Sequence, residues 1–310
     1  MKIFKKILCP VDFSEYSILA LRYATALAKD NDAELIVYHS IPDLTPAISY
    51  LEGEFLLTVS DALLNNAKST LDSWIQKHVG TDLHVEKVVG QGNPAESIVE
   101  ITQKLRIDLL VMGTHGVTGY ERFLMGSVTN RVLHKSSVPV LVVSKTSHHF
   151  IYEGEQNPVQ IKRIVCPLDF DNNNLWTIGI ALSFARKYDS EMIFIHVINR
   201  KQNGNWRELE KQALSKLQSL AAPVVDENIP AKFLVLSGDP AEVILTTLEV
   251  ENADLVIMGH HTRNPIEEIF LGSIARRVVT NSSRPILVAR TLMDTLKEVP
   301  EIHHVSVVEG

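Results

Sequence analysis

The sequence has few residues that could form covalent cross-links. Its two cysteines, Cys9 and Cys166, lie far apart and belong to no C-x-x-C motif. This spacing argues against a disulfide framework, since small secreted domains carry several cysteines at close intervals. We therefore expect a cytoplasmic protein with reduced thiols.

Long hydrophobic runs are also missing. No apolar stretch approaches the roughly 20 residues that a membrane-spanning helix needs. The first residues, MKIFKKILCPVDF, have a basic start but neither a long apolar core nor a small-residue cleavage site. The sequence therefore predicts no membrane span and no signal peptide.

An excess of positive charge is the third absence. The formal net charge is −7 and the isoelectric point is about 5.9, which argues against nucleic acid or an anionic membrane as the main partner. The composition, 45% hydrophobic and 22% charged, is typical of a soluble globular protein. At 310 residues, the chain is long enough for two domains.

The chain is an internal repeat. Five segments recur in the same order: KKILCPVDF (5–13) as KRIVCPLDF (162–170), AELIVYHSI (33–41) as SEMIFIHVI (190–198), GQGNPAESIV (90–99) as LSGDPAEVIL (236–245), IDLLVMGTH (107–115) as ADLVIMGHH (253–261), and SVPVLVVS (137–144) as SRPILVAR (283–290). The offset falls from 157 to 146, so the first copy has a longer middle. We predict domains at 1–145 and 161–290, a polar linker at 146–160 and a C-terminal tail at 291–310.

Within the first copy, strand and helix patterns alternate. The expected strands are 6–11, 34–39, 83–89, 108–112 and 138–143, and the expected helices follow Ser14, span 55–79, begin at Asn93-Pro94 and span 126–135. Several of the strands are apolar throughout, which indicates a parallel sheet covered on both faces. Ligands of such α/β folds bind at the carboxyl ends of the strands.

A glycine loop follows one of these strands. Gly113 ends the strand, Gly116 follows after two residues, and Gly126-Ser127 opens a helix after nine more. Glycines permit close approach of backbone N–H groups to a phosphate, and a helix N-terminus adds positive potential. Arg122 could add a charge above the phosphates. Asp12, at the end of the first strand, could accept hydrogen bonds from a ribose hydroxyl or the adenine amino group.

Each half resembles the universal stress protein family, and the chain looks like a tandem member. The resemblance depends on ILCPVDFS, LIVYHSI, DLLVMGTHG and the pattern G-x2-G-x9-G-[S/T], which Gly113, Gly116, Gly126 and Ser127 match. It implies two tandem Rossmann-like α/β domains, each a five-stranded parallel sheet with helices on both faces, that pair edge to edge through their last strands.

The resemblance also implies a site for ATP, ADP or AMP, with Mg²⁺ left open. By this resemblance, Asp12 contacts adenine and Ser40 and Met112 line the base and ribose, although Ser40 replaces the expected apolar residue. Ribose and phosphates are then held by Gly113, Gly116, Gly126, Ser127 and Val128.

The second copy departs from this pattern. It keeps Asp169, Gly259 and Gly272-Ser273, but Thr262 replaces the middle glycine and Glu268 replaces Arg122. A Cβ and a negative charge beside the phosphates both oppose binding. The sequence therefore predicts that nucleotide binds mainly to the first half.

Three functions remain open at this point. The first is a nucleotide-binding regulatory or sensor protein in the stress response, with an unknown protein partner. The second is a slow ATPase or autophosphorylating enzyme, although the sequence has no Walker A or kinase motif set and no assigned catalytic residue. The third is an interaction scaffold that does not depend on nucleotide. No metal site is expected, and dimerisation of the tandem chain stays open.

Overall fold

The computed structural model describes residues 1–42, 53–79, 83–114, 125–144, 149–152, 159–170, 174–198, 206–222, 229–260 and 271–289. The first half contains β1 (Lys6–Pro10), α1 (Glu15–Asn31), β2 (Glu34–Ile41), α3 (Gly53–Val79), β3 (Val85–Gln91), α4 (Pro94–Lys104), β4 (Leu109–Gly113), α5 (Ser127–Lys135) and β5 (Val140–Val143). The second half contains β6 (Arg163–Pro167), α6 (Asn174–Tyr188), β7 (Glu191–Ile198), α7 (Trp206–Ala221), β8 (Ala231–Ser237), α8 (Pro240–Val250), β9 (Leu255–Gly259), α9 (Ser273–Asn281) and β10 (Ile286–Ala289).

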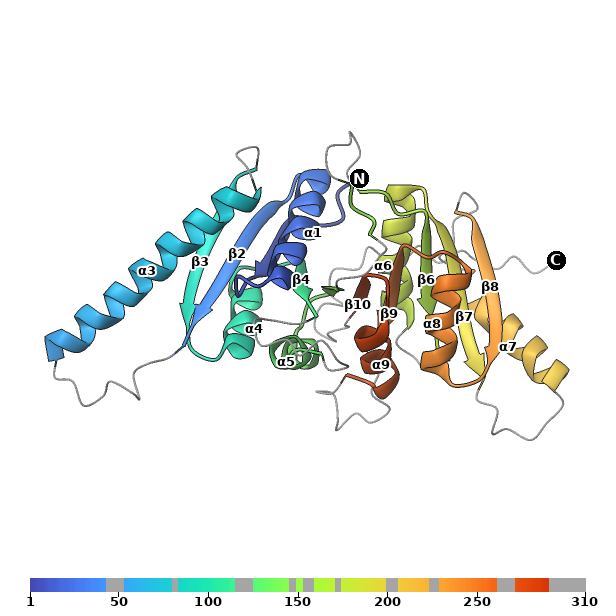
Figure 1. Ribbon diagram of the computed structural model, residues 1–310. Coiled ribbons are helices and arrows are strands. Elements are labelled where there is room, and N and C mark those ends of the chain that lie inside the picture. The colour runs from blue at the N-terminus through green and yellow to red at the C-terminus, as the bar shows by residue number, and fades with distance from the viewer. Residues whose placement is uncertain are drawn as a thin grey trace, which may run out of the picture.

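The ten strands form one continuous sheet in the order β3-β2-β1-β4-β5-β10-β9-β6-β7-β8 (Figure 1). All neighbouring strands within each half are parallel, and β5 and β10 pair antiparallel where the halves meet. The second half thus repeats the strand order of the first, which is that of a Rossmann-like unit. The expected fold class is confirmed.

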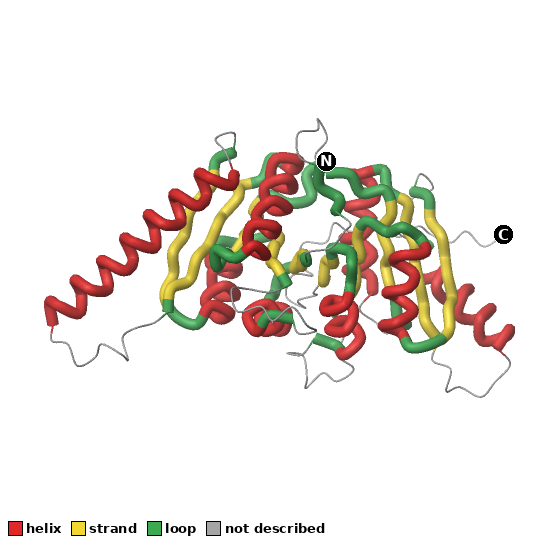
Figure 2. The backbone as a smooth tube through the Cα atoms, viewed as in Figure 1, coloured by secondary structure: helices red, strands yellow, loops and turns green. Residues whose placement is uncertain are grey.

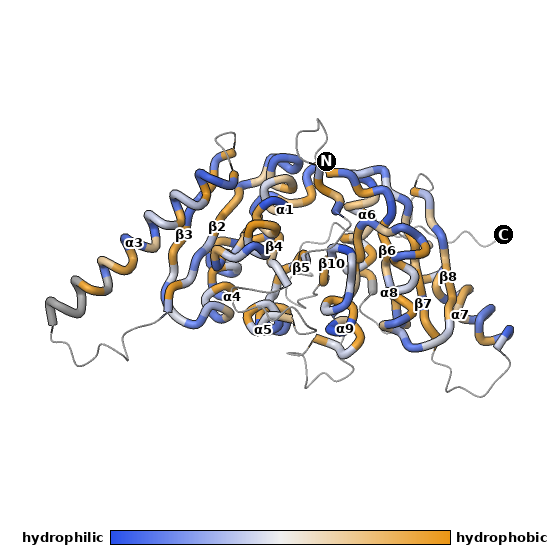
Figure 3. Tube along the Cα trace, in the orientation of Figure 1, coloured by the Kyte–Doolittle hydropathy of each residue, from blue (hydrophilic) through white to orange (hydrophobic). Residues whose placement is uncertain are grey.

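Helices cover both faces of the sheet (Figure 2). One buried cluster joins side chains of α1, α3, α6 and α7 to the sheet, as in Leu21, Leu71, Phe184 and Leu217. The other joins α4, α5, α8 and α9 to the opposite face. Figure 3 shows the central strands as predominantly hydrophobic, as expected for strands buried on both faces.

Side-chain caps fix where several helices begin. The Ser14 hydroxyl accepts a hydrogen bond from the Ser17 N–H at 3.2 Å and starts α1. Asn93 caps α4 and is followed by Pro94, and Asp239 with Pro240 repeats this arrangement at α8. Proline suits the first helical position because its missing N–H would have no intrahelical partner there. The predicted helix start at Asn93-Pro94 is confirmed.

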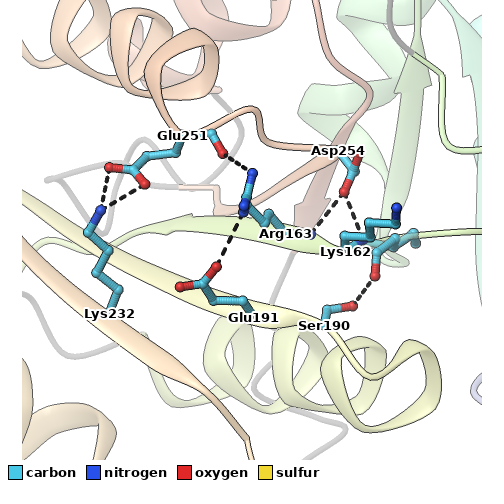
Figure 4. Close-up of polar contacts among 8 residues, drawn as sticks. Lys162, Arg163, Ser190, Glu191, Lys232, Glu251 and Asp254 are labelled. Carbon is cyan, nitrogen blue, oxygen red and sulfur yellow. Dashed lines mark hydrogen bonds and ion pairs between the residues drawn. The ribbon is translucent and has the colours of Figure 1, made fainter.

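One carboxylate in each half aligns strands at the start of the sheet, Asp254 being buried and Asp108 half-buried. Asp254 Oδ2 accepts hydrogen bonds from the N–H groups of Lys162 and Arg163 at 2.7 and 2.9 Å (Figure 4). Asp108 Oδ2 makes the same pair of contacts with Lys5 and Lys6, also at 2.7 and 2.9 Å. Each carboxylate ties the entry of one strand to its neighbour, so the carboxyl ends of these strands are also brought into register.

The last strands of the two halves cover each other. Leu141 pairs with Leu287, Val140 with Val288 and Val142 with Ile286, and all of these residues are buried. The repeat offset of 146 makes Leu141 and Leu287 equivalent positions. The pairing is therefore arranged about a pseudo-two-fold axis that passes through these two leucines, and the expected edge-to-edge pairing is confirmed.

The segment predicted as a polar linker contributes to the core. Phe150 is completely buried and packs edge-on against Tyr23 with ring centroids 4.8 Å apart. Ile151 and Val159 are also buried and form an antiparallel bridge. Residues 146–160 are polar on average, but three of their apolar side chains are buried, and Phe150 anchors the connection on the first half.

Candidate functional site

The candidate site lies where β1 and β4 end side by side. The chain leaves β1 through α1, which packs on one face of the sheet, and leaves β4 towards α5, which packs on the other. This divergence is the topological switch point of the fold, and ligands of open α/β sheets bind at such a point. The predicted site residues on β1, β4 and α5 thus belong to one region.

Asp12 is held by the start of α1. Its Oδ1 accepts hydrogen bonds from the Ser14 N–H at 3.1 Å and from the Ser17 hydroxyl at 2.5 Å. The Asp12 N–H in turn donates to Ser17 Oγ at 2.9 Å. Ser17 is buried, whereas Asp12 is partly exposed. The carboxylate is therefore fixed in orientation by its own helix and remains accessible at the sheet edge.

Phe13, next to Asp12, has a φ of 66°. Left-handed backbone is uncommon for a bulky residue and concentrates at functional sites. Its ring lies 4.4 Å from His39 and 5.5 Å from Trp74 of α3, between ring centroids. His39 Nδ1 lies 2.8 Å from the Val11 carbonyl oxygen and must donate to it, because a carbonyl only accepts. These contacts hold the turn that presents Asp12.

Gly113 is required by close packing. A Cβ at this position would lie 2.9 Å from both the Cβ and the carbonyl oxygen of Tyr16 in the first turn of α1. Such distances are too short for any side chain. The glycine therefore allows the end of β4 to approach α1, which brings the Asp12 turn beside the end of β4.

The start of α5 is tied to the end of β4. The Thr129 hydroxyl donates to the Gly113 carbonyl oxygen at 2.8 Å, and the Gly126 N–H donates to the Thr114 carbonyl oxygen at 2.7 Å. Gly126 is the N-cap and has no side chain to accept from the first-turn N–H groups. Because the first N–H groups of a helix have no intrahelical partner, this start can bind an anion.

The remaining predicted site residues differ in their contacts and exposure. Ser40 lies at the end of β2, and its hydroxyl donates to the Gly92 carbonyl oxygen at 3.3 Å. The Met112 side chain is buried in the core, so its main chain is the part that can face a ligand. Ser127 is exposed and Val128 partly buried in the first turn of α5. Gly116 and Arg122 lie outside the described residues.

The second half repeats part of this geometry. His196 Nδ1 lies 2.8 Å from the Leu168 carbonyl oxygen, before Asp169, and its ring stacks on Phe170 at 3.8 Å. Burial lowers the pKa of His196, against the opposing effects of the Leu168 carbonyl and Asp169. Lys216 Nζ lies 4.6 Å from the centre of the Phe170 ring.

One described difference separates the two helix starts. Gly272 caps α9 as Gly126 caps α5, with Ser273 exposed beside it. The position of Thr129 is taken by Ala275, which has no hydroxyl to bond to the end of β9. Thr262 and Glu268 lie outside the described residues. The second helix start therefore lacks one of the bonds that join the first to its strand.

Sequence patterns did not indicate Tyr16, Ser17 or Thr129. These residues act by contacting the site residues, and their contacts arise from the docking of α1 and α5 rather than from a motif. The Ser-x-x-Ser spacing that starts α1 was a usable signal for Ser17. Within the described part of the chain, no group of three or more metal-ligating side chains comes together, and no helix there has the length and apolarity of a membrane span.

The comparisons with known proteins agree with this architecture. The model of the universal stress protein family matches residues 3–144 and 160–290. A universal stress protein of Mycolicibacterium smegmatis is 24% identical over 299 residues, covering 92% of this chain and 96% of that protein. Universal stress protein MJ0531 of Methanocaldococcus jannaschii is 37% identical over 150 residues, covering 46% of this chain and 84% of its own length.

A solved structure extends the likeness to the whole fold. The crystal structure of a universal stress protein from Archaeoglobus fulgidus superimposes with a TM-score of 0.67 at 22% identity, covering 93% of this chain and 97% of that one. The strand order, the repeat and the family match all agree. The chain therefore belongs to the universal stress protein family and carries two copies of its domain.

Proposed function

We propose that the protein binds an adenine nucleotide at the switch point of its first half and acts as a regulatory or sensor protein in the stress response. The observation that carries this proposal is that two complementary groups lie at the carboxyl ends of the neighbouring strands β1 and β4. An oriented carboxylate, Asp12, lies at the end of β1, and a helix start without a side-chain cap, at Gly126, is bonded to the end of neighbouring β4.

The two groups suit opposite ends of a nucleotide. The first N–H groups of α5 and the positive end of its dipole favour phosphate oxygens. Asp12 can accept hydrogen bonds from the adenine amino group or from a ribose hydroxyl. Its orientation by Ser14 and Ser17 reduces the side-chain entropy lost on binding. Gly116 and Arg122 are proposed to add a close backbone approach and a positive charge.

Ligand binding is proposed to be weaker in the second half. Ala275 cannot make the strand–helix bond of Thr129, and Thr262 and Glu268 replace Gly116 and Arg122 in the sequence. This asymmetry supports one nucleotide per chain. The second half would then serve as a partner for the first rather than as an equal binding site.

The test is nucleotide content and binding in matched variants. We expect mass spectrometry of ligand released from the denatured wild-type protein to detect adenine nucleotide, and calorimetry of the emptied protein with ATP, ADP and AMP to give one site. Gly126→Val should abolish binding because its side chain crowds the first-turn N–H groups, whereas Gly272→Val should leave it unchanged. Two equal sites per chain, or equal binding by both variants, would overturn the proposal.

A further inference from the structure

An ion pair joins equivalent positions of the two halves. Lys187 Nζ lies 2.8 Å from Asp30 Oδ2, between the C-terminal ends of α6 and α1. Lys187 follows Asp30 by 157 positions, the same offset that relates β1 to β6 and β2 to β7. The two residues therefore occupy the same place in the repeat, with opposite charges.

Equivalent residues can touch each other only close to a two-fold axis. In a symmetric pairing, a residue away from the axis meets a different residue of its partner, whereas one on the axis meets its own counterpart. Leu141 and Leu287 form one such pair within the sheet. Asp30 and Lys187 form a second one beyond the sheet, so both pairs lie on the pseudo-two-fold axis.

The charged pair is largely withdrawn from water. The Lys187 side chain is 9% exposed and that of Asp30 is 25% exposed. Lys187 Nζ also donates to the Asp30 carbonyl oxygen at 2.8 Å and to Asn31 Oδ1 at 3.2 Å. The Tyr188 hydroxyl donates to Asp30 Oδ2 at 2.7 Å. Each of these contacts therefore joins one half to the other.

We propose that Asp30 and Lys187 select the pairing of a first half with a second half and exclude pairing of like halves. Two first halves, from two chains, would bring Asp30 against Asp30 on the axis, and two second halves would bring Lys187 against Lys187. The strands at the junction supply no such selection, because Leu141 and Leu287 are alike and their neighbours are all aliphatic. The partner that this surface fits is the other half of the same chain.

Charge reversal in the full-length protein reproduces the excluded pairings. Lys187→Asp places two aspartates on the axis, as in a pairing of two first halves, and Asp30→Lys places two lysines there. The double variant Asp30→Lys/Lys187→Asp restores opposite charges in exchanged positions. Because the axis relates the two helix ends, a lysine at position 30 can reach the end of α6 as Lys187 reaches the end of α1. The adjacent equivalent positions differ, with Asn31 in the first half and Tyr188 in the second, so most of the protection is expected to return rather than all of it.

Hydrogen–deuterium exchange of peptides that cover β5 and β10 measures the opening of the junction directly. We expect each single reversal to speed this exchange by about 100-fold, since juxtaposed like charges at an interface weaken association by that order. The double variant should recover most of the protection. A matched control reverses the exposed pair Lys6 and Glu34, whose side chains are 37% and 38% exposed within the first half, and should leave the junction unchanged.

Two results would overturn the proposal. One is exchange in the single reversals no faster than in the Lys6→Glu/Glu34→Lys control. The other is additive behaviour, in which the double variant loses as much protection as the two single variants lose together. If a single reversal does not fold, the double variant still decides: a folded double variant supports selection by charge, and an unfolded one refutes it.

Discussion

The Thr129 hydroxyl donates a hydrogen bond of 2.8 Å to the carbonyl oxygen of Gly113 and so joins the start of α5 to the end of β4. The bond fixes the distance between the strand end and the helix N–H groups proposed to bind phosphate. In the second half Ala275 occupies the position of Thr129. The difference between Thr129 and Ala275 therefore offers a way to test by experiment whether the starts of α5 and α9 differ in function.

Removal of this hydroxyl should weaken nucleotide binding. We expect Thr129→Ala to lower affinity about tenfold and the free energy of unfolding by about 1 kcal/mol, the usual contribution of one hydrogen bond. Calorimetry with ATP and denaturant unfolding measure the two effects. Thr129→Ser keeps the hydroxyl and should bind as the parent does; a serine variant as weak as the alanine variant would contradict this role.

A methyl group at Gly113 should disturb the contact between β4 and α1. We expect Gly113→Ala to destabilise the protein by about 1–3 kcal/mol, the range for an overpacked core, because its Cβ would meet Tyr16 at 2.9 Å. Gly179 is the matched control, since it is exposed in α6 and a Cβ there meets no atom within 4 Å. Gly179→Ala should stabilise by about 0.5–1 kcal/mol. Thermal unfolding of both variants decides, and equal effects would refute the packing argument.

His196 should titrate below the ordinary histidine range. Burial lowers its pKa in the folded protein, so the unfolded chain binds the proton more readily. The contribution of His196 to stability is therefore complete above the unfolded value of about 6.5 and declines as the pH falls below it. NMR titration of the imidazole protons measures this pKa. His196→Gln should remove that part of the pH dependence, and a folded pKa at or above the ordinary value would contradict it.

The two thiols should be unreactive in the folded protein. Cys9 and Cys166 are fully buried, and burial raises the pKa of each thiol well above its ordinary value. Unfolded thiols ionise near pH 8.5, so stability should fall as the pH rises beyond that point. We expect a thiol reagent at pH 8 to label neither cysteine until denaturant is added. Rapid labelling of either residue under native conditions would refute this expectation.

Much of the fold could be predicted because its signals are local. Asn93-Pro94 starts α4 as predicted, and the repeat supplied the second half from the first. The predicted strand from Asp108 begins one residue later, at Leu109, and the Asp108 carboxylate accepts hydrogen bonds from the Lys5 and Lys6 amides. That contact spans more than a hundred residues, and no local pattern encodes it.

The sequence predicted the main residues of the candidate site but not the contacts that support them. The glycine spacing indicated Gly113 and Gly126, since glycine reports directly on backbone approach. Thr129 and Tyr16 could not be recognised, because their roles depend on how α5 and α1 dock against β4. The burial of Phe150 was missed for a similar reason: one aromatic side chain in a polar segment finds its place only against Tyr23.

The continuous sheet has a consequence for how the molecule responds to a ligand. Each of the two hydrophobic clusters contains side chains of both halves, with Leu141 and Leu287 in one of them and Val140 and Val288 in the other. Opening one half would therefore expose part of the core of its neighbour, and we expect the halves to unfold as a cooperative unit. A ligand that binds only the first half lowers the population of opened forms of the entire chain. Amide exchange in the half without a ligand would thus become slower when the other half is occupied, with no change in its own contacts.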